Sequence, residues 1–343
     1  MTDVETPSAP SYSGPPFSAR FQVLQQLPPS DLSALTATGE TAGFQTRLAP
    51  PSPWVYIAVI GPLYFLVGGV VQQIQLPLGL LWNQALLFVW PSLIWLWEAG
   101  FRPLRFTRLN RVPRRPWLVL GVALTAFVCA SALMGVFETL APPDWVNLFD
   151  ETKVLSSVSG GWNVVLFAGV IIGAPLAEEL VFRGCLLPML AERMRLGWAI
   201  VIQAALFSFI HGDPIGFLPR FLLGVAFGLL WIYSGSLWAG IFAHALNNGV
   251  SALVFFGIGP ETGDFAIGEL WPGVAAVVGA GALLTLFLWL LRRTTTPPSL
   301  PSSDVEALGL PVGRAALFNA LRIYAAVGLV SLGFVALTGH LLQ

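Results

Sequence analysis

Long apolar stretches constrain this chain more than any other feature of its sequence. A helix needs about 20 consecutive apolar residues to cross the hydrocarbon core of a bilayer. Of the 343 residues, 55% are hydrophobic and only 10% are charged, which is too apolar for a soluble globular protein. We therefore expect an all-α polytopic integral membrane protein with eight or nine transmembrane helices. The expected helices cover about residues 54–71, 78–97, 117–140, 162–189, 196–211, 217–233, 237–256, 270–291 and 318–342.

Arginine residues are distributed unevenly between the connecting segments. Arg193, Arg195, Arg292 and Arg293 lie in alternate connections, whereas the connection at 141–161, expected to be a loop, is mainly acidic. Six more arginines precede the third stretch: Arg102, Arg105, Arg108, Arg111, Arg114 and Arg115. The positive-inside rule then places the N-terminus and this six-arginine loop in the cytoplasm. Because lysine is sparse and Arg, Ala, Leu and Gly are abundant, we expect a bacterial chain in the bacterial cytoplasmic membrane.

The chain divides into four expected regions. Residues 1–52 read as a flexible Pro/Ser-rich tail, 53–140 carry three transmembrane helices, 161–257 form a helical core, and 258–343 carry further helices with a Pro/Ser-rich linker at 294–311. The sequence has no block of basic residues of the kind that grips nucleic acid, so no nucleic-acid partner is expected. The lipid bilayer is the expected surrounding, and the pattern leaves the oligomeric state open.

Three ionisable residues lie inside one apolar stretch: Glu178, Glu179 and Arg183. Each charge at the centre of a membrane helix costs roughly 2.5 to 3.5 kcal/mol, so such a cluster indicates a partner, a cavity or a reaction. Glu179 and Arg183 are four residues apart and can pair on a helix, whereas Glu178 is turned about 100° away from Glu179. The spacing predicts that Glu179 is held by Arg183 while Glu178 is free for chemistry. The alternative is a cluster at a helix end whose charges reach the interface.

Two of the three histidines repeat this spacing in later apolar stretches. Phe207 and His211 are four residues apart, as are His244 and Asn248. If the helix that carries Glu178 continues through Met189 to an exit near Arg193, Glu178 lies about 22 Å and His211 about 24 Å from the cytoplasmic end, so they can meet. The alternative for each polar residue taken singly is a hydrogen bond between helices.

Two smaller features concern the stretch at 217–233. Gly224 and Gly228 are spaced as Gly-x-x-x-Gly, which predicts close packing against another helix. Arg220 lies near the start of the stretch and is expected to reach the interface with its side chain.

Three ordered motifs resemble those of the CPBP intramembrane endopeptidases, which include the type II CAAX prenyl proteases and the Abi proteins. The motifs are Glu-Glu-x-x-x-Arg at 178–183, Phe-x-x-x-His at 207–211 and His-x-x-x-Asn at 244–248. They lie on expected membrane helices, and the resemblance covers about residues 161–256. It implies a helical membrane hydrolase, a glutamic endopeptidase that needs no metal cofactor.

The resemblance also implies a role for each motif residue. Glu178 would be the base that activates water, with His211 orienting that water. His244 and Asn248 would donate hydrogen bonds to the oxyanion. The remaining motif residues, Glu179, Arg183 and Phe207, would support the site. Because prenylated CAAX proteins are not expected in bacteria, the expected substrate is a membrane-associated peptide or protein.

Three alternatives remain open from the sequence. Glu178, His211 and His244 could hold zinc with a water as fourth ligand, in a zinc-dependent membrane protease. A non-catalytic membrane scaffold or bacteriocin-immunity protein could share the fold. A transporter could use buried carboxylates and histidines to relay protons, although no inverted repeat is evident.

Overall fold

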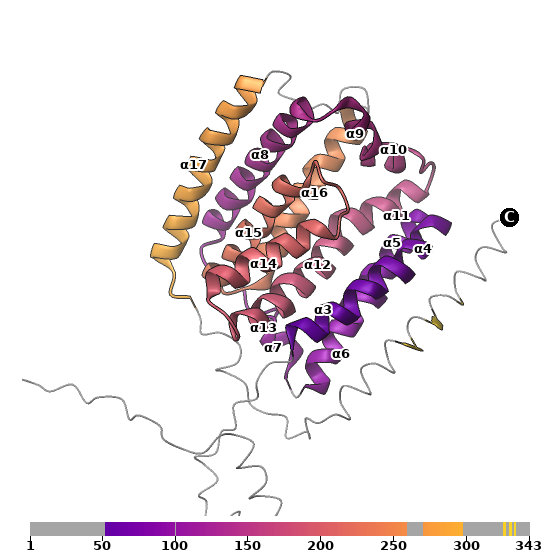
Figure 1. Ribbon diagram of the computed structural model, residues 1–343. Helices are drawn as coiled ribbons and strands as arrows, with labels where there is room; N and C mark the ends of the chain where they lie inside the picture. The colour runs from indigo at the N-terminus through magenta and orange to yellow at the C-terminus, as the bar shows by residue number, and fades with distance from the viewer. Residues whose placement is uncertain are drawn as a thin grey trace, which may run out of the picture. The chain divides into compact units, whose positions relative to one another are not determined.

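Helices are the only regular elements in the residues that the computed structural model describes, which are 52–99, 101–258, 270–297 and five positions between 325 and 333 (Figure 1). Within this part of the chain, seven helices are long and apolar enough to cross a membrane. A shorter apolar helix, α14 (Leu196–Phe209), adds to them. The all-α membrane prediction is confirmed. The tail at 1–51 and most of the ninth expected stretch lie outside the described residues.

The first three crossings follow the expected ranges closely. The first is built from α3 (Pro53–Pro62), the π-helical turn η2 (Leu63–Gly68) and α4 (Gly69–Ile74). The second is built from α5 (Leu76–Trp82), η3 (Asn83–Val89) and α6 (Trp90–Glu98). A short α7 (Pro103–Phe106) leads to the third crossing, α8 (Pro116–Leu140).

The connection at 141–161 differs from the loop expected there, because it contains the short helices α9 (Pro143–Leu148) and α10 (Glu151–Ser156). Proline at the start of α9 and Asp144 in its first turn suit a helix N-terminus, where the proline ring fixes φ and the carboxylate meets the positive end of the helix dipole. The polar composition of the segment favoured a loop in the sequence analysis, in spite of these local helix signals.

The fourth crossing is continuous over Trp162–Ala191. It contains α11 (Trp162–Ala168), η4 (Gly169–Gly173), α12 (Ala174–Glu179), η5 (Leu180–Leu186) and α13 (Leu187–Ala191). The helix therefore runs past Arg183, as the predicted meeting of Glu178 and His211 requires. The remaining elements are α14, α15 (Phe217–Ser234), α16 (Leu237–Ile258) and α17 (Leu270–Thr294).

Close packing between α14 and α15 depends on glycine. A Cβ atom added at Gly224 would lie 2.8 Å from the Cβ of Ala204, and one added at Gly228 would lie 3.0 Å from Nε2 of Gln203. Both distances are shorter than ordinary van der Waals contacts, so the predicted role of the Gly-x-x-x-Gly pair is confirmed. In a membrane, such close backbone approach gains packing and hydrogen bonds between helices.

The six-arginine loop packs against the turn between α15 and α16. Arg108 is buried, its Nη1 donates to the carbonyl oxygen of Trp231 at 3.1 Å, and its guanidinium lies 3.9 Å from the Trp231 ring centroid. The Trp231 indole donates in return to the carbonyl of Thr107 at 3.2 Å. The backbone N–H of Arg114 donates to the carbonyl of Ser234 at 3.2 Å. This loop therefore closes one end of α15 and α16, beyond any role in setting orientation.

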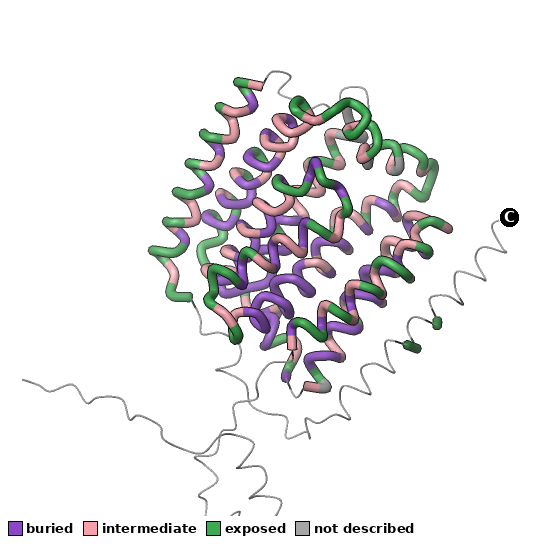
Figure 2. The backbone as a smooth tube through the Cα atoms, in the orientation of Figure 1, coloured by how far each residue is buried: buried purple, intermediate pink, exposed green. Residues whose placement is uncertain are grey.

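Buried residues gather in the interior of the bundle, while the outward faces of α17 and of the first crossing are exposed (Figure 2). One apolar cluster surrounds η5, α13 and α14, and a second joins α8, α15 and α17. The fully buried polar side chains beside the first cluster include Glu179, Arg183 and Gln203. They mark the centre of the candidate site.

Candidate active site

Glu179 and Arg183 form a buried ion pair on the fourth crossing. Arg183 Nη1 donates to Glu179 Oε1 at 2.7 Å, and both side chains are 0% exposed. The pair predicted from the four-residue spacing is therefore present. Arg183 lies in the π-helical turn η5, directly after α12, and such turns are frequent at functional sites.

Neighbouring helices contact the Arg183 guanidinium in the interior, although its Nε has no hydrogen-bond partner among the described residues. Its Nη2 donates to the carbonyl oxygen of Gly224 at 3.3 Å, and the same oxygen accepts from Nε2 of Gln203 at 2.9 Å. The guanidinium carbon lies 4.3 Å from the ring centroid of Phe207, within the range of a cation–π contact. The cation thus links the fourth crossing to α14 and α15.

His244 shares the same carboxylate oxygen of Glu179. Its Nδ1 lies 3.1 Å from Glu179 Oε1, so Nδ1 carries a proton and donates to the carboxylate. The sequence linked Glu179 only to Arg183 and missed this contact. It is made possible by Gly240 on α16, where an added Cβ would lie 2.5 Å from Glu179 Oε2. Glycine there lets α16 approach the carboxylate.

Glu178 faces both imidazole rings. Its Oε2 lies 3.9 Å from Nε2 of His244 and 4.0 Å from Nε2 of His211. The side chain is 14% exposed, and among the described residues Oε2 is buried with no hydrogen-bond partner. These distances exceed a direct hydrogen bond and suit groups that share one small bridging molecule. Of the two carboxylates, Glu178 is thus the one outside the ion pair with Arg183, and its part in a reaction stays a prediction.

His211 is oriented by the helix that carries it. Its Nδ1 lies 2.9 Å from the carbonyl oxygen of Phe207, which can only accept, so Nδ1 donates. In the neutral ring, Nε2 is then an acceptor that faces Glu178. The Phe207 ring centroid lies 5.2 Å from that of His211 and 5.7 Å from that of His244, so Phe207 packs against both rings.

Asn248 is held by two neighbours on the far side of His244. Its Nδ2 donates to the carbonyl of Val170 in η4 at 2.9 Å, and its Oδ1 accepts from Nδ2 of Asn247 at 3.2 Å. One of the two Nδ2 hydrogens is used by Val170, which leaves the other for a further acceptor. Asn247 is a positioning contact that the sequence could not distinguish from its neighbour.

The connection between α14 and α15 contains an ion pair that sequence reasoning missed. Arg220 Nη1 lies 2.6 Å from Asp213 Oδ2, and the Asp213 side chain is 4% exposed. Asp213 also accepts the backbone N–H groups of Ile215 and Gly216, both at 2.9 Å. Arg220 therefore pairs inside the protein, and the expectation that it reaches the interface is wrong. The available signal was an acidic residue two positions after a candidate histidine.

The zinc alternative has no further support from spacing. In the part of the chain that the structure describes, no group of three or more His, Cys, Asp or Glu side chains is arranged to hold a metal ion.

The fold and these contacts define a class: polytopic helical membrane proteins with a glutamate, arginine and histidine cluster buried between four helices. Residues 160–250 match the family model described as type II CAAX prenyl endopeptidase Rce1-like. The match confirms the resemblance that the three motifs indicate.

Three relatives agree with that match. The chain is 30% identical over 164 residues to CAAX prenyl protease 2 of Rattus norvegicus, covering 48% of this chain and 46% of that protein. It is 28% identical over 176 residues to CAAX prenyl protease 2 of Arabidopsis thaliana, covering 41% and 56%. It is 26% identical over 99 residues to YdiL of Bacillus subtilis (strain 168), a provisionally named membrane peptidase, covering 29% and 40%.

The chain thus spans about half the length of the curated relatives it matches. No solved structure matches it.

Proposed function

We propose that this protein is an intramembrane endopeptidase that hydrolyses a peptide bond of a membrane-associated peptide or protein with a water activated by Glu178. The observation that carries the proposal is the position of Glu178 Oε2, 3.9 Å from His244 Nε2 and 4.0 Å from His211 Nε2 in a buried cluster. The names of the matched family and relatives support the reaction class.

The first step is proton transfer from water to Glu178. Because His211 donates from Nδ1 to Phe207, its Nε2 and the Glu178 carboxylate are two acceptors that face each other. A water between them donates one hydrogen to each. When Glu178 takes its proton, the oxygen bonds to the carbonyl carbon, and the electron pair of the carbonyl bond moves to its oxygen.

The oxyanion that results needs hydrogen-bond donors. His244 already donates from Nδ1 to Glu179, so donation from Nε2 requires the doubly protonated ring. The second N–H of the Asn248 side chain is the other proposed donor to the oxyanion. Collapse of the intermediate breaks the carbon–nitrogen bond, and Glu178 returns its proton to the leaving amine.

Glu179 and Arg183 hold this arrangement without touching substrate. Their shared oxygen orients His244 and fixes the helix turn that carries Glu178. We therefore assign them, with Phe207, as positioning residues. The arginine distribution supports a cytoplasmic N-terminus in the bacterial cytoplasmic membrane.

The test is cleavage of a quenched-fluorescent peptide library by purified protein in detergent. Glu178→Gln keeps the shape of the side chain and removes the base, so we expect turnover to fall by about 10²- to 10⁴-fold, the usual contribution of a general base. Glu192→Gln, at an exposed glutamate on the next connection, is the matched control and should retain full activity. Both proteins should unfold at the wild-type temperature.

A strong zinc chelator separates the chemical alternatives. Activity that survives the chelator and is lost in Glu178→Gln supports the glutamate mechanism. Activity lost with chelator and restored by zinc would replace it with the metal mechanism. No cleavage by folded wild-type protein would favour the non-catalytic scaffold.

A further inference from the structure

The helix pair that carries His211 is shorter than its neighbours. At 1.5 Å per residue, the 14 residues of α14 and the 18 of α15 span about 21 and 27 Å, whereas the 25 residues of α8 span about 37 Å. The cytoplasmic end of α15 is level with the start of α8, because the Arg114 N–H donates to the Ser234 carbonyl. The connection after His211 therefore stops roughly 10 Å short of the far end of α8.

A polar recess lies in the space beyond that connection. It has a volume of about 230 Å³ and lies between the second half of α8, the start of α15 and the middle of α16. Five of its lining residues are polar or charged: Ser131, Glu138, Arg220, Asn247 and Ser251. At about 30 Å³ per water molecule, the recess has room for roughly seven waters or one large side chain.

One wall residue of the recess contacts a motif residue, and another pairs with a residue close to His211 in the sequence. Arg220 pairs with Asp213 in the connection that follows His211. Asn247 donates to Oδ1 of Asn248 and so fixes the orientation of that amide. The motif residues themselves lie outside the walls of the recess, and outside those of a larger cavity of about 660 Å³ around Gln72 and Trp162. The recess differs from the larger cavity in its bonds to neighbours of the site, through Arg220 and Asn247.

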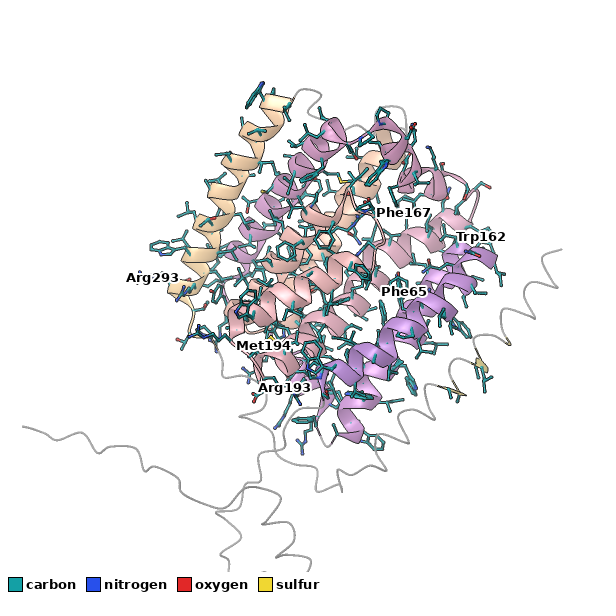
Figure 3. All side chains as sticks on the ribbon, viewed as in Figure 1. Phe65, Trp162, Phe167, Arg193, Met194 and Arg293 are labelled. Atoms are coloured by element: carbon teal, nitrogen blue, oxygen red, sulfur yellow. The ribbon has the colours of Figure 1, made fainter. Side chains whose placement is uncertain are left out.

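The opposite side of the site is closed. Arg183, Trp231 and Leu237 are each 0% exposed, and the six-arginine loop is hydrogen-bonded across the turn between α15 and α16. Figure 3 shows Arg193 and Arg293 at this end of the helices and Trp162 at the other end. In contrast, the side chains of Glu178 and His211 are 14% and 25% exposed. Buried side chains and the hydrogen-bonded loop thus cover the site at the arginine-rich end.

We propose that this recess, on the side of the bundle opposite the six-arginine loop, is the entrance through which a substrate segment and the hydrolytic water reach Glu178. The inference rests on the proposed function, and it names the substrate class. The substrate is a membrane-anchored or exported polypeptide whose scissile segment lies on the non-cytoplasmic side. Hydroxyl and amide groups of the walls bind its backbone, and Arg220 and Glu138 place charges of both signs at the rim.

Cysteine labelling tests the direction of access without any need for catalysis. Cys129 and Cys185 are buried, so wild type is the unlabelled baseline. Ser251→Cys reports access to the recess. Ser159→Cys reports access to the connection at 141–161, and Thr294→Cys reports access to the arginine-rich end. All three native side chains are exposed. A membrane-impermeant thiosulfonate should label Ser251→Cys from the same side as Ser159→Cys, and equally in a Glu178→Gln background.

Labelling of Ser251→Cys from the same side as Thr294→Cys would overturn the proposal. Labelling of Ser251→Cys only by a lipid-soluble maleimide would also overturn it, because that result would indicate access from within the bilayer. A second measurement connects the recess to the reaction. A bulky label on Ser251→Cys should slow peptide cleavage at least tenfold, whereas the same label on Ser159→Cys should leave it unchanged. Unchanged cleavage after complete labelling at Ser251 would refute the entrance while leaving the proposed hydrolysis intact.

Discussion

A single carboxylate oxygen, Oε1 of Glu179, organises the site at the scale of the residue. It accepts from Arg183 Nη1 at 2.7 Å and from His244 Nδ1 at 3.1 Å. Both donors are buried, so neither can turn to water if the oxygen is lost. The stability of the bundle and the orientation of His244 therefore depend on the same atom.

Replacing this carboxylate should cost stability as well as activity. Glu179→Gln leaves Arg183 as a buried charge without its partner, and breaking such a pair costs about 3–5 kcal/mol of the free energy of unfolding. The control is Asp150→Asn, which breaks the exposed pair with Lys153 at 3.7 Å and should cost less than about 1 kcal/mol. Tryptophan fluorescence during unfolding in detergent measures both. Equal losses in the two variants would show that burial does not set the cost.

Local spacing explains which of these contacts the sequence could predict. Glu179 and Arg183 are four residues apart on one helix, so their pairing follows from helix geometry alone. The contact between Glu179 and His244 spans 65 residues and depends on where α16 packs. Likewise, the hydrogen bond from Asn248 Nδ2 to the Val170 carbonyl depends on how α16 is rotated about its axis relative to η4. Such contacts require the packed structure.

At the scale of the element, glycine positions decide how closely the helices approach the site. Gly240 makes room for Glu179 Oε2, and Gly224 does the same for Ala204. The spacing of Gly224 and Gly228 was visible in the sequence as a motif. Gly240 belongs to no such motif, so its role follows only from the packing, in which an added Cβ would lie 2.5 Å from the carboxylate.

Gly240→Ala should therefore disturb the site through the helix that carries His244. The added methyl group would meet Glu179 Oε2 at 2.5 Å, and α16 would have to shift. Overpacking of this kind costs about 1–3 kcal/mol. Gly279→Ala on α17, where nothing lies within 4 Å of the added Cβ, is the matched control and should be neutral or stabilising by up to about 1 kcal/mol. Unfolding temperature and peptide cleavage are the two measurements.

A second prediction for an element concerns the connection after His211. Asp213 accepts two backbone N–H groups and the Arg220 guanidinium, so Asp213→Ala removes three hydrogen bonds from that turn. We expect cleavage to fall at least tenfold because His211 loses its fixed position. Arg220→Lys, which keeps the charge, should recover part of the activity that Arg220→Ala loses. If Asp213→Ala retains full turnover, the turn does not position His211.

At the scale of the whole molecule, the bilayer explains why the fold was predictable. Every crossing must satisfy its backbone within one helix of sufficient length, so hydropathy alone located the seven candidate spans of the described residues to within a few residues. The short helices α9 and α10 lie outside that constraint and were expected to be a loop. The recess is also a property of the assembled bundle, since its walls come from α8, α15 and α16.

Orientation in the membrane is the last prediction, because it decides which compartment the recess faces. Arg193, Arg195, Arg292 and Arg293 all lie at helix ends on the side of the six-arginine loop, and basic ends stay in the cytoplasm. Alkaline phosphatase, which is active only after export, should be active when fused after Leu140 and inactive when fused after Thr294. The reverse pattern would place the arginine-rich end outside. The recess would then open to the cytoplasm, and the substrate would be a cytoplasmic segment.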